Sequence, residues 1–389
     1  MGRRARRAVV VGGGTGGLAA AVALQSASID VVVLEKALTL DAVQVGGGHI
    51  LWHNAVLALR RLGLGDAVEA VAPVVERYEF RTSAGRLLAT WPVGERGREL
   101  GVPTVAIGRP ALHRILREAA GDVVREGAAA VAVRQDGDGA TVVLADGSEE
   151  RGDVVVGADG LRSVVRSQVL GPAEPVYAGY TAWQGVTSFA DRSVPDGVFT
   201  NTSGPGIRFF SFRIDRGDTV YWDGVIGARA GGKKQTKGTR RETLLAQFGQ
   251  WHAPIPSLIE STAEDTITAI DIYDRNPVST WGEGRITLLG DAAHPSTFNL
   301  GQGACQALED AVVLGRTLAA HDDAVVGLRA YEGSRMKRTA AMTVTARRIG
   351  KIEQVSNPLV CRLRDAFVSV AHERLVLRQT YALMMSHDL

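Results

Sequence analysis

The chain has 389 residues, of which 45% are hydrophobic and 22% are charged. This composition is ordinary for a globular protein and excludes a disordered, fibrous or multi-span membrane protein, while the length predicts two or three domains. The 44 basic and 42 acidic residues leave a net charge of +2, so no charge excess predicts a nucleic-acid or anionic-membrane partner.

The cysteines and histidines offer no metal site and no disulfide framework. Cys305 and Cys361 are too few and too far apart for either, and they favour a reducing, cytoplasmic location. His49 and His53 stand four residues apart, but they follow a glycine-rich stretch and no acid lies between them. We therefore expect no metal ion.

The first 24 residues resemble a secretory leader, because a basic start precedes a mostly small and apolar stretch. The β-branched run Val9–Val11 and the glycines that follow it favour a buried strand and a turn instead. No other stretch has about 18 uninterrupted apolar residues, so no membrane span is expected.

Apolar runs and helical patterns alternate over the first 175 residues. Apolar runs predict buried strands at Ala8–Val11, Asp30–Leu34 and Asp153–Val156. Turn residues separate two predicted hairpins, Tyr78–Thr82 with Leu87–Trp91 and Ala129–Arg134 with Ala140–Leu144. Helices are predicted at Leu18–Gln25, Asn54–Leu62 (with Asn54 as a cap) and Arg109–Ala120.

From about Val176 to Thr280 the pattern changes to strands rich in aromatic residues. The predicted strands are Gly179–Val186, Gly197–Thr202, Ile207–Ile214 and Thr219–Ile226. A buried strand returns at Ile286–Leu289, followed by a helix from about Gly303 to Ala319 and a largely helical tail. Because the alternating pattern resumes after the β-rich segment, we expect two interleaved domains.

The glycines after the first strand form the pattern G-x-G-x-x-G, as Gly12, Gly14 and Gly17. The first permits a tight turn, the second lets the backbone approach a pyrophosphate, and the third lets the helix pack close to the strand. Glu35 ends the second strand, where an acid can bind a ribose hydroxyl pair. The motif predicts an adenine dinucleotide without distinguishing FAD from NAD; the alternative is a glycine-rich turn that only packs the unit.

Two later motifs have no use in a simple NAD dehydrogenase. One runs from Asp153 to Arg166 and contains Asp159-Gly160; the other runs from Gly284 through Gly290-Asp291 to Gly303. Together the three motifs resemble the single-component (group A) flavoprotein monooxygenases, which have the fold of p-hydroxybenzoate hydroxylase. The resemblance extends from about Ala8 to Ala319 and is strongest to the branch of salicylate, 3-hydroxybenzoate and urate hydroxylases and zeaxanthin epoxidase.

The resemblance implies a role for each matched residue. The glycines of the first motif would hold the FAD pyrophosphate and Glu35 the ribose. Arg109 would reach the ribityl-phosphate region, and Asp291 the ribityl hydroxyls. Asp159 would contribute to binding both FAD and NAD(P)H, or would only cap a turn. The segment Asn299–Ala304 would direct a helix N-terminus at the flavin ring. The full candidate set for the cofactor is Gly12, Gly13, Gly14, Thr15, Gly16, Gly17, Glu35, Lys36, Gly46, Gly48, Arg109, Asp159, Gly290, Asp291, Gly301, Gly303 and Ala304.

The chain departs from the family pattern at three positions. Phe298 stands where a proline usually lies against the flavin, which puts the substrate geometry in question. His53 replaces another proline and is expected to be solvated or to cap a helix, or else to touch substrate. Gln184 stands where the family often has arginine, which suggests a less anionic substrate, although a purely local hydrogen bond explains it as well.

The implied reaction is that of an FAD-dependent, NAD(P)H-consuming monooxygenase. NADH or NADPH would reduce FAD, O2 would form a flavin C4a-hydroperoxide, and one oxygen would hydroxylate an aromatic or other apolar small molecule. Because the cofactor carries the chemistry, no catalytic dyad is expected; Phe210, Phe212, Tyr221, Gln184 and Phe298 are candidates for the substrate pocket. Epoxidation of a polyene, terpenoid or polyketide and a non-catalytic flavin-binding homologue remain alternatives, and the reductant, the substrate and the oligomeric state stay open.

The expected fold class is α/β, with a Rossmann-like FAD-binding domain interleaved with a mostly antiparallel β-sheet substrate domain. We expect the FAD-binding domain to comprise residues 1–75, 106–175 and 283–322, and the substrate domain residues 76–105 and 176–282. Helices would fill residues 323–389. The helical spacing of Leu359, Leu363, Phe367 and Val370 predicts that this tail closes the core, with an interface as the alternative.

Overall fold

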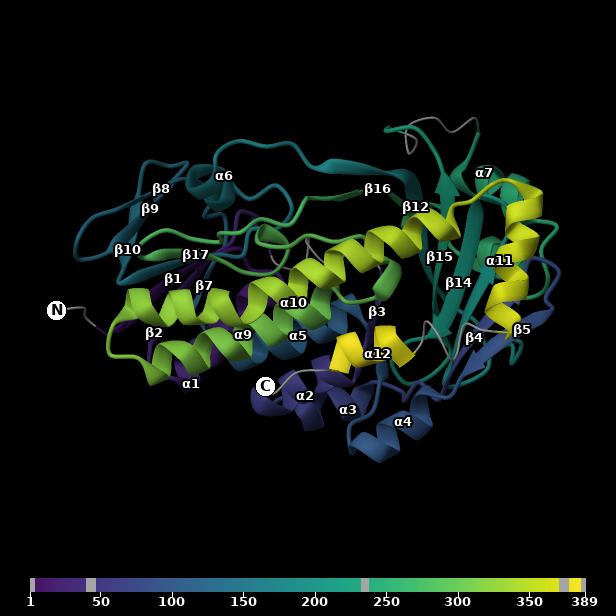
Figure 1. Ribbon diagram of the computed structural model, residues 1–389, viewed down its shortest axis with the longest axis horizontal. Coiled ribbons are helices and arrows are strands. Elements are labelled where there is room, and N and C mark those ends of the chain that lie inside the picture. The colour runs from purple at the N-terminus through teal and green to yellow at the C-terminus, as the bar shows by residue number, and fades with distance from the viewer. Residues whose placement is uncertain (1–3, 40–46, 232–237, 371–377, 386–389) are drawn as a thin grey trace.

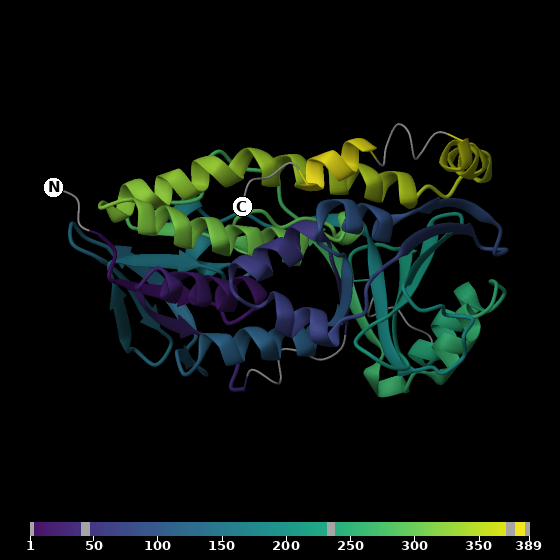
Figure 2. The same cartoon turned by 90° about the horizontal axis from the view of Figure 1, so that it is seen from below.

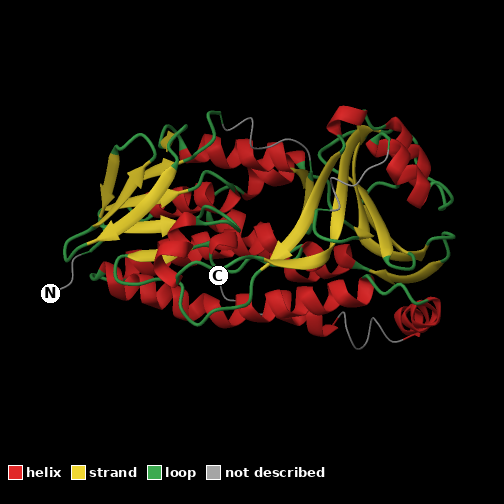
Figure 3. Cartoon of the chain, turned by 90° about the horizontal axis from the view of Figure 1, so that it is seen from above, coloured by secondary structure: helices red, strands yellow, loops and turns green. Residues whose placement is uncertain are grey.

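The computed structural model of the protein describes residues 4–39, 47–231, 238–370 and 378–385. Two large β-sheets lie towards opposite ends of an elongated molecule, and long helices run between and alongside them (Figure 1). Figure 3 shows the strands gathered at the two ends. The first glycine motif follows a strand of one sheet, whereas the predicted pocket residues Phe210, Phe212 and Tyr221 belong to the other.

The first sheet has five parallel strands in the order β17-β11-β1-β2-β7. Its central strand β1 contains the valine run Val9–Val11, which is fully buried, as expected for a parallel strand covered on both faces. The sheet brings together three well-separated parts of the chain. Its strands are β1 (Arg7–Val11), β2 (Asp30–Leu34), β7 (Val124–Arg125), β11 (Val154–Gly157) and β17 (Ile286–Leu288).

Four helices cover and extend this sheet. Helix α1 (Thr15–Ser26) contacts both α5 (Arg109–Ala120) and α9 (Gly303–Ala320). Helix α9 in turn contacts α10 (Ala324–Glu353). The N-cap of α10 is Asp323, whose carboxylate accepts from the N–H groups of Val325 and Val326. Helix α10 runs along one side of the molecule from the first sheet to the second (Figure 2), so its C-terminal end reaches the β-rich part of the chain.

The second sheet has seven strands in the order β16-β12-β15-β14-β13-β4-β5, antiparallel except for the parallel pair β13 and β4. Alternation along β14 places Phe209 on one face, against α7 (Arg240–Phe248) and α8 (Ile255–Ser261), and Phe210 and Phe212 on the other. The strands are β4 (Arg77–Thr82), β5 (Leu87–Trp91), β12 (Val176–Ser188), β13 (Val198–Ser203), β14 (Ile207–Arg213), β15 (Thr219–Gly227) and β16 (Thr268–Asp274).

Shorter elements complete the fold. Strands β3 (Gly48–Leu51) and β6 (Val105–Gly108) form an antiparallel pair, and a three-stranded sheet joins β8 (Ala130–Gln135), β9 (Ala140–Leu144) and β10 (Glu149–Gly152). The remaining helices are α2 (His53–Arg61), α3 (Gly65–Val71), α4 (Val93–Leu100), α6 (Val164–Leu170), α11 (Pro358–Val370) and α12 (Arg378–Met385), with short 3-10 turns at Glu264–Thr266, Gly290–Ala292 and Phe298–Leu300.

The predicted α/β fold with a mostly antiparallel second sheet is confirmed, but two local predictions are wrong. Asn54 does not cap α2: Trp52 holds the cap position, and the Asn54 side chain is buried among polar groups. The apolar side chains of α11 do not close the core: Leu359, Leu363 and Val370 are 68%, 71% and 82% exposed. Helix α11 contacts β5 and buries the face that carries Cys361, which leaves the predicted stripe outside.

Two further observations concern the described residues only. None of their helices is both long and apolar enough to cross a membrane. No group of three or more His, Cys, Asp or Glu among them is arranged to hold a metal ion.

Candidate active site

A cavity of about 510 Å³ is lined by residues that follow strands of the first sheet and by residues on strands of the second. The loop after β1 and the loop between β17 and α9 form one part of its wall, and strands β12, β13, β14 and β15 form another. Most of the predicted site residues line this cavity: Gly14, Thr15, Gly16, Gly48, Arg109, Gln184, Phe210, Phe212, Tyr221, Gly290, Asp291, Phe298, Gly301, Gly303 and Ala304. Predicted residues that are more than 280 positions apart in the chain thus face one space.

The glycines of the first motif differ in what surrounds them. A Cβ on Gly12, whose φ is +108°, would lie 2.4 Å from the carbonyl oxygen of Ala158, and a Cβ on Gly17 would lie 1.9 Å from that of Gly12. A Cβ on Gly14 would meet nothing within 4 Å. Gly12 and Gly17 therefore serve packing of the strand, turn and helix, whereas Gly14 leaves room for a ligand at the N-terminus of α1.

Six other predicted residues lie outside the cavity lining, and Gly46 lies outside the described residues. The Glu35 carboxylate accepts from the N–H of Gly13 at 2.7 Å and of Ala37 at 2.9 Å, so it fixes the glycine loop. The lining likewise omits Gly12, Gly13, Gly17 and Lys36. Glu35 therefore acts on the cavity indirectly, through its hydrogen bond to Gly13 in the glycine loop.

Asp159 also lies outside the lining and binds the start of helix α6, whose N-cap is Ser163. Its carboxylate accepts from the Ser163 hydroxyl at 2.5 Å and from the Val164 N–H at 2.7 Å. From the same helix, Arg166 donates to the carbonyl oxygens of Ala292 and Ala293 at 2.8 and 2.9 Å. The motif thus supports the loop that carries Asp291.

Asp291 and Arg109 are charged side chains at the end of the cavity that is formed by the loops after β1 and β17. Asp291 is exposed and lines the cavity, and desolvation by the surrounding protein raises the pKa of its carboxyl, although His294 and Arg109 oppose this. Burial and the nearby Arg109 lower the pKa of His49 to about 3, so this histidine is neutral. An acid and a fixed positive charge therefore face the same space, which suits a ligand with hydroxyl groups and phosphates.

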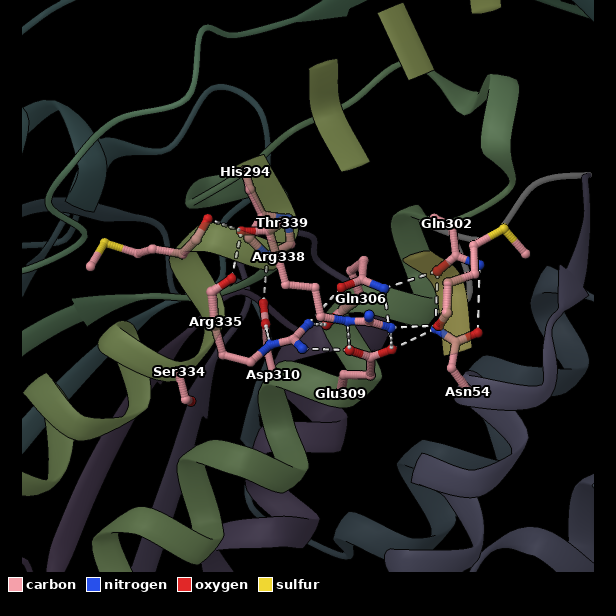
Figure 4. Close-up of polar contacts among 12 residues, drawn as sticks. Asn54, His294, Gln302, Gln306, Glu309, Asp310, Ser334, Arg335, Arg338 and Thr339 are labelled. Carbon is pink, nitrogen blue, oxygen red and sulfur yellow. Dashed lines mark hydrogen bonds and ion pairs between the residues drawn. The ribbon is translucent and has the colours of Figure 1, made fainter. Parts of the chain in front are cut away.

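A buried ion cluster lies behind the two loops that border this end of the cavity (Figure 4). Arg335 of α10 is fully buried, donates to Asp310 at 2.6 Å and to the Gln306 side chain at 2.7 Å, and pairs with Glu309. Asp310 accepts from the N–H of Gly290 at 3.0 Å. Although burial opposes ionisation, Arg335 contributes to lowering the pKa of both carboxyl groups.

The cluster continues to the other loop through Asn54, which donates to Glu309 at 2.6 Å and to the Gln302 side chain at 3.0 Å. Gln302 precedes α9, whose first residue Gly303 lines the cavity. Arg338 pairs with Glu309 and donates to main-chain oxygens of α12. The ion cluster therefore joins the 3-10 turn Gly290–Ala292, the start of α9 and helix α12.

The β-sheet end of the cavity is aromatic and polar at once. Phe210, Phe212 and Phe298 line it, and Phe199 packs against Phe210 and Phe212 at centroid distances of 5.4 and 5.1 Å. Asp223, which is 1% exposed, accepts from the Tyr221 hydroxyl at 3.0 Å and from the Gln184 amide at 3.1 Å. Gln184 thus lines the cavity and also makes the local hydrogen bond expected of it.

Sequence reasoning missed Arg208, which lines this end and is only 3% exposed. Its guanidinium carbon lies 5.0 Å from the ring centre of Phe298 and 5.4 Å from that of Phe210, and the group pairs with Glu353. A signal was present, because Arg208 shares the strand periodicity that places Phe210 and Phe212 on one face. Arg208 supplies a positive charge to the cavity from β14, and the less anionic substrate suggested by Gln184 stays a prediction.

His53 neither lines the cavity nor faces solvent. It is fully buried, its Nδ1 lies 2.6 Å from the Val102 carbonyl oxygen, and its ring packs edge-on against Tyr381. Burial lowers its pKa, opposed by main-chain hydrogen bonds. The expectation of a solvated or capping histidine is wrong, because α2 turns this side chain into the protein interior.

Comparison with known proteins identifies the family. Residues 6–346 match the family model described as FAD binding domain. The chain belongs to the FAD-binding domain family. This flavoenzyme is 41% identical to aurachin C monooxygenase/isomerase of Stigmatella aurantiaca over 92% of both chains, and 33% identical to an FAD-dependent urate hydroxylase of Klebsiella pneumoniae over 88% and 89% of the two chains.

A solved structure agrees with these relatives. Klebsiella pneumoniae HpxO in complex with FAD and uric acid superposes with a TM-score of 0.89 at 30% identity, covering 97% of this chain and 96% of that one. The predicted family, the monooxygenase class and FAD as cofactor are thereby confirmed. The roles of individual residues toward FAD stay predictions.

The different surroundings of Gly14 and Gly17 predict different effects of the same substitution. Gly14→Ala adds a methyl group in open cavity at an unstrained backbone (φ −76°, ψ −176°), so the fold should persist while FAD affinity falls by about 10-fold or more. Gly17→Ala drives a methyl group into the main chain and should prevent folding. Circular dichroism and FAD titration of the apoprotein check both; Gly14→Ala with unchanged FAD affinity would contradict the assignment.

The buried position of Arg335 predicts a large loss of stability when its charge is removed. Arg335→Met leaves Glu309 and Asp310 with one fewer buried partner, so the free energy of unfolding should fall by about 3–5 kcal/mol. The exposed pair of Arg192 and Asp196 provides the control, since Arg192→Met should change stability little. Urea titration of both holoenzymes measures the difference, and equal stabilities would refute the importance of the ion cluster.

Proposed function

We propose that this flavoenzyme hydroxylates a planar aromatic or heteroaromatic molecule that presents a hydrogen-bond acceptor beside a hydrogen-bond donor. The reaction consumes NADH or NADPH and O2. The observation that carries the proposal is a pair of unsatisfied, buried polar groups of opposite charge, Arg208 and Asp223, on an aromatic cavity wall.

Both polar groups have atoms without a partner. Nε and Nη2 of Arg208 and Oδ1 of Asp223 are buried and have no hydrogen-bond partner among the described residues. An unsatisfied buried polar atom costs about 1–3 kcal/mol, and more when the group is charged. A substrate that accepts from Arg208 and donates to Asp223 removes this cost, whereas a purely apolar molecule leaves both groups unsatisfied.

The aromatic wall favours a flat ring between these polar groups. Phe210, Phe212, Tyr221 and Phe298 surround the space, and aromatic faces pack against planar rings. Two relatives are named for substrates of this kind, urate and 3-amino-4-hydroxybenzoate. Both molecules combine a ring with N–H or O–H donors and oxygen acceptors, which supports the same class for this chain.

We propose that the opposite end of the cavity holds FAD. Gly14 and the N–H groups at the start of α1 would bind the pyrophosphate, Arg109 the phosphate region and Asp291 the ribityl hydroxyls. The first turn of α9 at Gly303 would direct its positive end at the flavin ring. When bound, FAD supplies the hydride acceptor and the site of oxygen activation, while the protein orients the substrate and excludes water.

We also propose the interleaved division into domains that the sequence predicts. Residues 1–75, 106–175 and 283–322 would bind FAD, residues 76–105 and 176–282 would bind substrate, and 323–389 would form the C-terminal helices. Cys305 and Cys361 are both free, which supports the proposed cytoplasmic location.

The function is tested by substrate-stimulated turnover of the FAD-loaded enzyme. Aurachin C, urate and 3-amino-4-hydroxybenzoate, the substrates named in the relatives, form the first panel, with benzene and toluene as apolar controls. At least one polar ring compound should accelerate NAD(P)H oxidation and yield a product that contains one oxygen atom from ¹⁸O2. Acceleration by the apolar controls alone would exclude the role given to Arg208 and Asp223.

The surroundings of Asp223 predict a pH dependence of substrate affinity. Burial raises the pKa of its carboxyl to about 6, although Gln184, Arg208 and Tyr221 oppose the shift. Because the ionised carboxylate is the better acceptor for a substrate N–H or O–H, affinity should rise as the pH increases through about 6. Dissociation constants from flavin absorbance titrations between pH 5 and 8 measure this; Asp223→Asn should abolish the inflection, and its persistence would assign it to another group.

A further inference from the structure

One carboxylate oxygen at the end of α10 joins three distant parts of the chain. Oε2 of Glu353 pairs with Nη1 of Arg208 from β14 and accepts from Nδ2 of Asn299 at 2.6 Å. Asn299 belongs to the turn before α9 and accepts from the Tyr180 hydroxyl at 2.6 Å. Arg208 and Asn299 line the cavity and Glu353 is not among the lining residues, so Glu353 acts on the cavity through its partners.

Close approach of α10 makes this contact possible. A Cβ on Gly350 would lie 3.0 Å from the Asn299 side-chain oxygen and 3.1 Å from the Tyr180 hydroxyl. Beyond the helix, the N–H of Gly206 donates to the Val355 carbonyl oxygen at 2.8 Å. The C-terminal end of α10 is therefore held against both the turn before α9 and the turn between β13 and β14.

Arg208 has a second carboxylate within reach. In the pairing of β14 with β15, Phe210 lies opposite Asp223, and Arg208 lies two residues before Phe210 on the same face. Arg208 and Asp223 are thus diagonal neighbours, a separation that a long side chain spans. Their open atoms, Nε and Nη2 on one side and Oδ1 on the other, carry opposite charge when Asp223 is ionised.

We propose that Glu353 is a positioning residue that holds Arg208 away from Asp223 and thereby keeps the polar end of the substrate cavity open. The rings of Phe210 and Phe298 support the same arrangement, since the guanidinium lies over both. Without the Glu353 carboxylate, the buried guanidinium turns to Asp223, and the two groups satisfy each other instead of a substrate.

This inference rests on the proposed function only where substrate affinity is concerned. The position of Arg208 in the substrate-free holoenzyme tests it independently, by a crystal structure of Glu353→Gln. Glu353→Asp keeps the charge and serves as the conservative variant. Asp365→Asn is the matched control, because Asp365 is also partly buried and paired with an arginine, at 18% side-chain exposure against 15% for Glu353.

In the Glu353→Gln structure we expect the Arg208 guanidinium within 4 Å of the Asp223 carboxylate. An Arg208 that stays over Phe210 and Phe298 would overturn the proposal. Should Glu353→Gln fail to fold, a crystal structure of the double variant Glu353→Gln/Asp223→Asn replaces it. In that structure the Arg208 guanidinium should leave the rings of Phe210 and Phe298 without gaining a new carboxylate partner. An unmoved Arg208 would overturn the proposal there too.

Binding and turnover provide the second readout, with urate, 3-amino-4-hydroxybenzoate and aurachin C as probes in flavin absorbance titrations. Glu353→Gln should raise the dissociation constant of the probe by about 10-fold or more and should raise KM in parallel, while kcat at saturation changes by less than about 3-fold. FAD content should stay unchanged, Glu353→Asp should restore part of the affinity, and Asp365→Asn should have no effect. In an Asp223→Asn background the effect of Glu353→Gln should shrink, because the competing partner is gone.

The pH profile distinguishes positioning from general damage. Arg208 on β14, Tyr221 on β15 and Gln184 on β12 face Asp223. A guanidinium that moves onto Asp223 lowers the pKa of that carboxyl, so the inflection near pH 6 should move to lower pH in Glu353→Gln and not in Asp365→Asn. An unmoved inflection would count against the proposal. If no probe binds the wild type, the proposed substrate class fails, and the crystal structure still decides the positioning role.

Discussion

The burial of Arg335 between Glu309 and Asp310 is the constraint on which the architecture of the site depends. A charge removed from water is tolerated only when it is paired and hydrogen-bonded, and Arg335 meets this condition with partners on the neighbouring helix α9. Through Asp310 the pairing reaches Gly290, and through Glu309 and Asn54 it reaches Gln302. The positions of both cavity loops therefore follow from the packing of α9 against α10.

The end of the cavity formed by the second sheet depends on the contacts of the Arg208 guanidinium. Phe298 is one of the positions at which the chain departs from the expected family pattern, and the guanidinium of Arg208 lies over its ring and over that of Phe210. The residue that departs from the expected pattern, Phe298, is therefore one of the two rings under the Arg208 guanidinium. Glu353 pairs with Nη1 of the same guanidinium, so two aromatic rings and one carboxylate surround the Arg208 side chain at this end of the cavity.

The parts of the site predicted from the sequence are those set by local geometry. Gly12, Gly14 and Gly17 follow from the steric needs of a strand-turn-helix unit, and the apolar face of Phe210 and Phe212 follows from strand alternation. Arg208 and Asn54 escaped prediction because their burial depends on carboxylates 145 and 255 residues away in the chain. For α11 the spacing of Leu359 and Leu363 identified an apolar face, but spacing carries no information about which neighbour covers it.

The order of the strands has a consequence for synthesis of the chain. β17 at Ile286–Leu288 completes the first sheet that β1 begins, and β4 and β5 must wait for β13 before they join the second. Neither sheet can be finished until most of the polypeptide has left the ribosome. Strands with open hydrogen-bonding edges are thus present throughout translation, when unpaired edges favour aggregation, so folding yield in a heterologous host depends on the rate of translation and on chaperone supply.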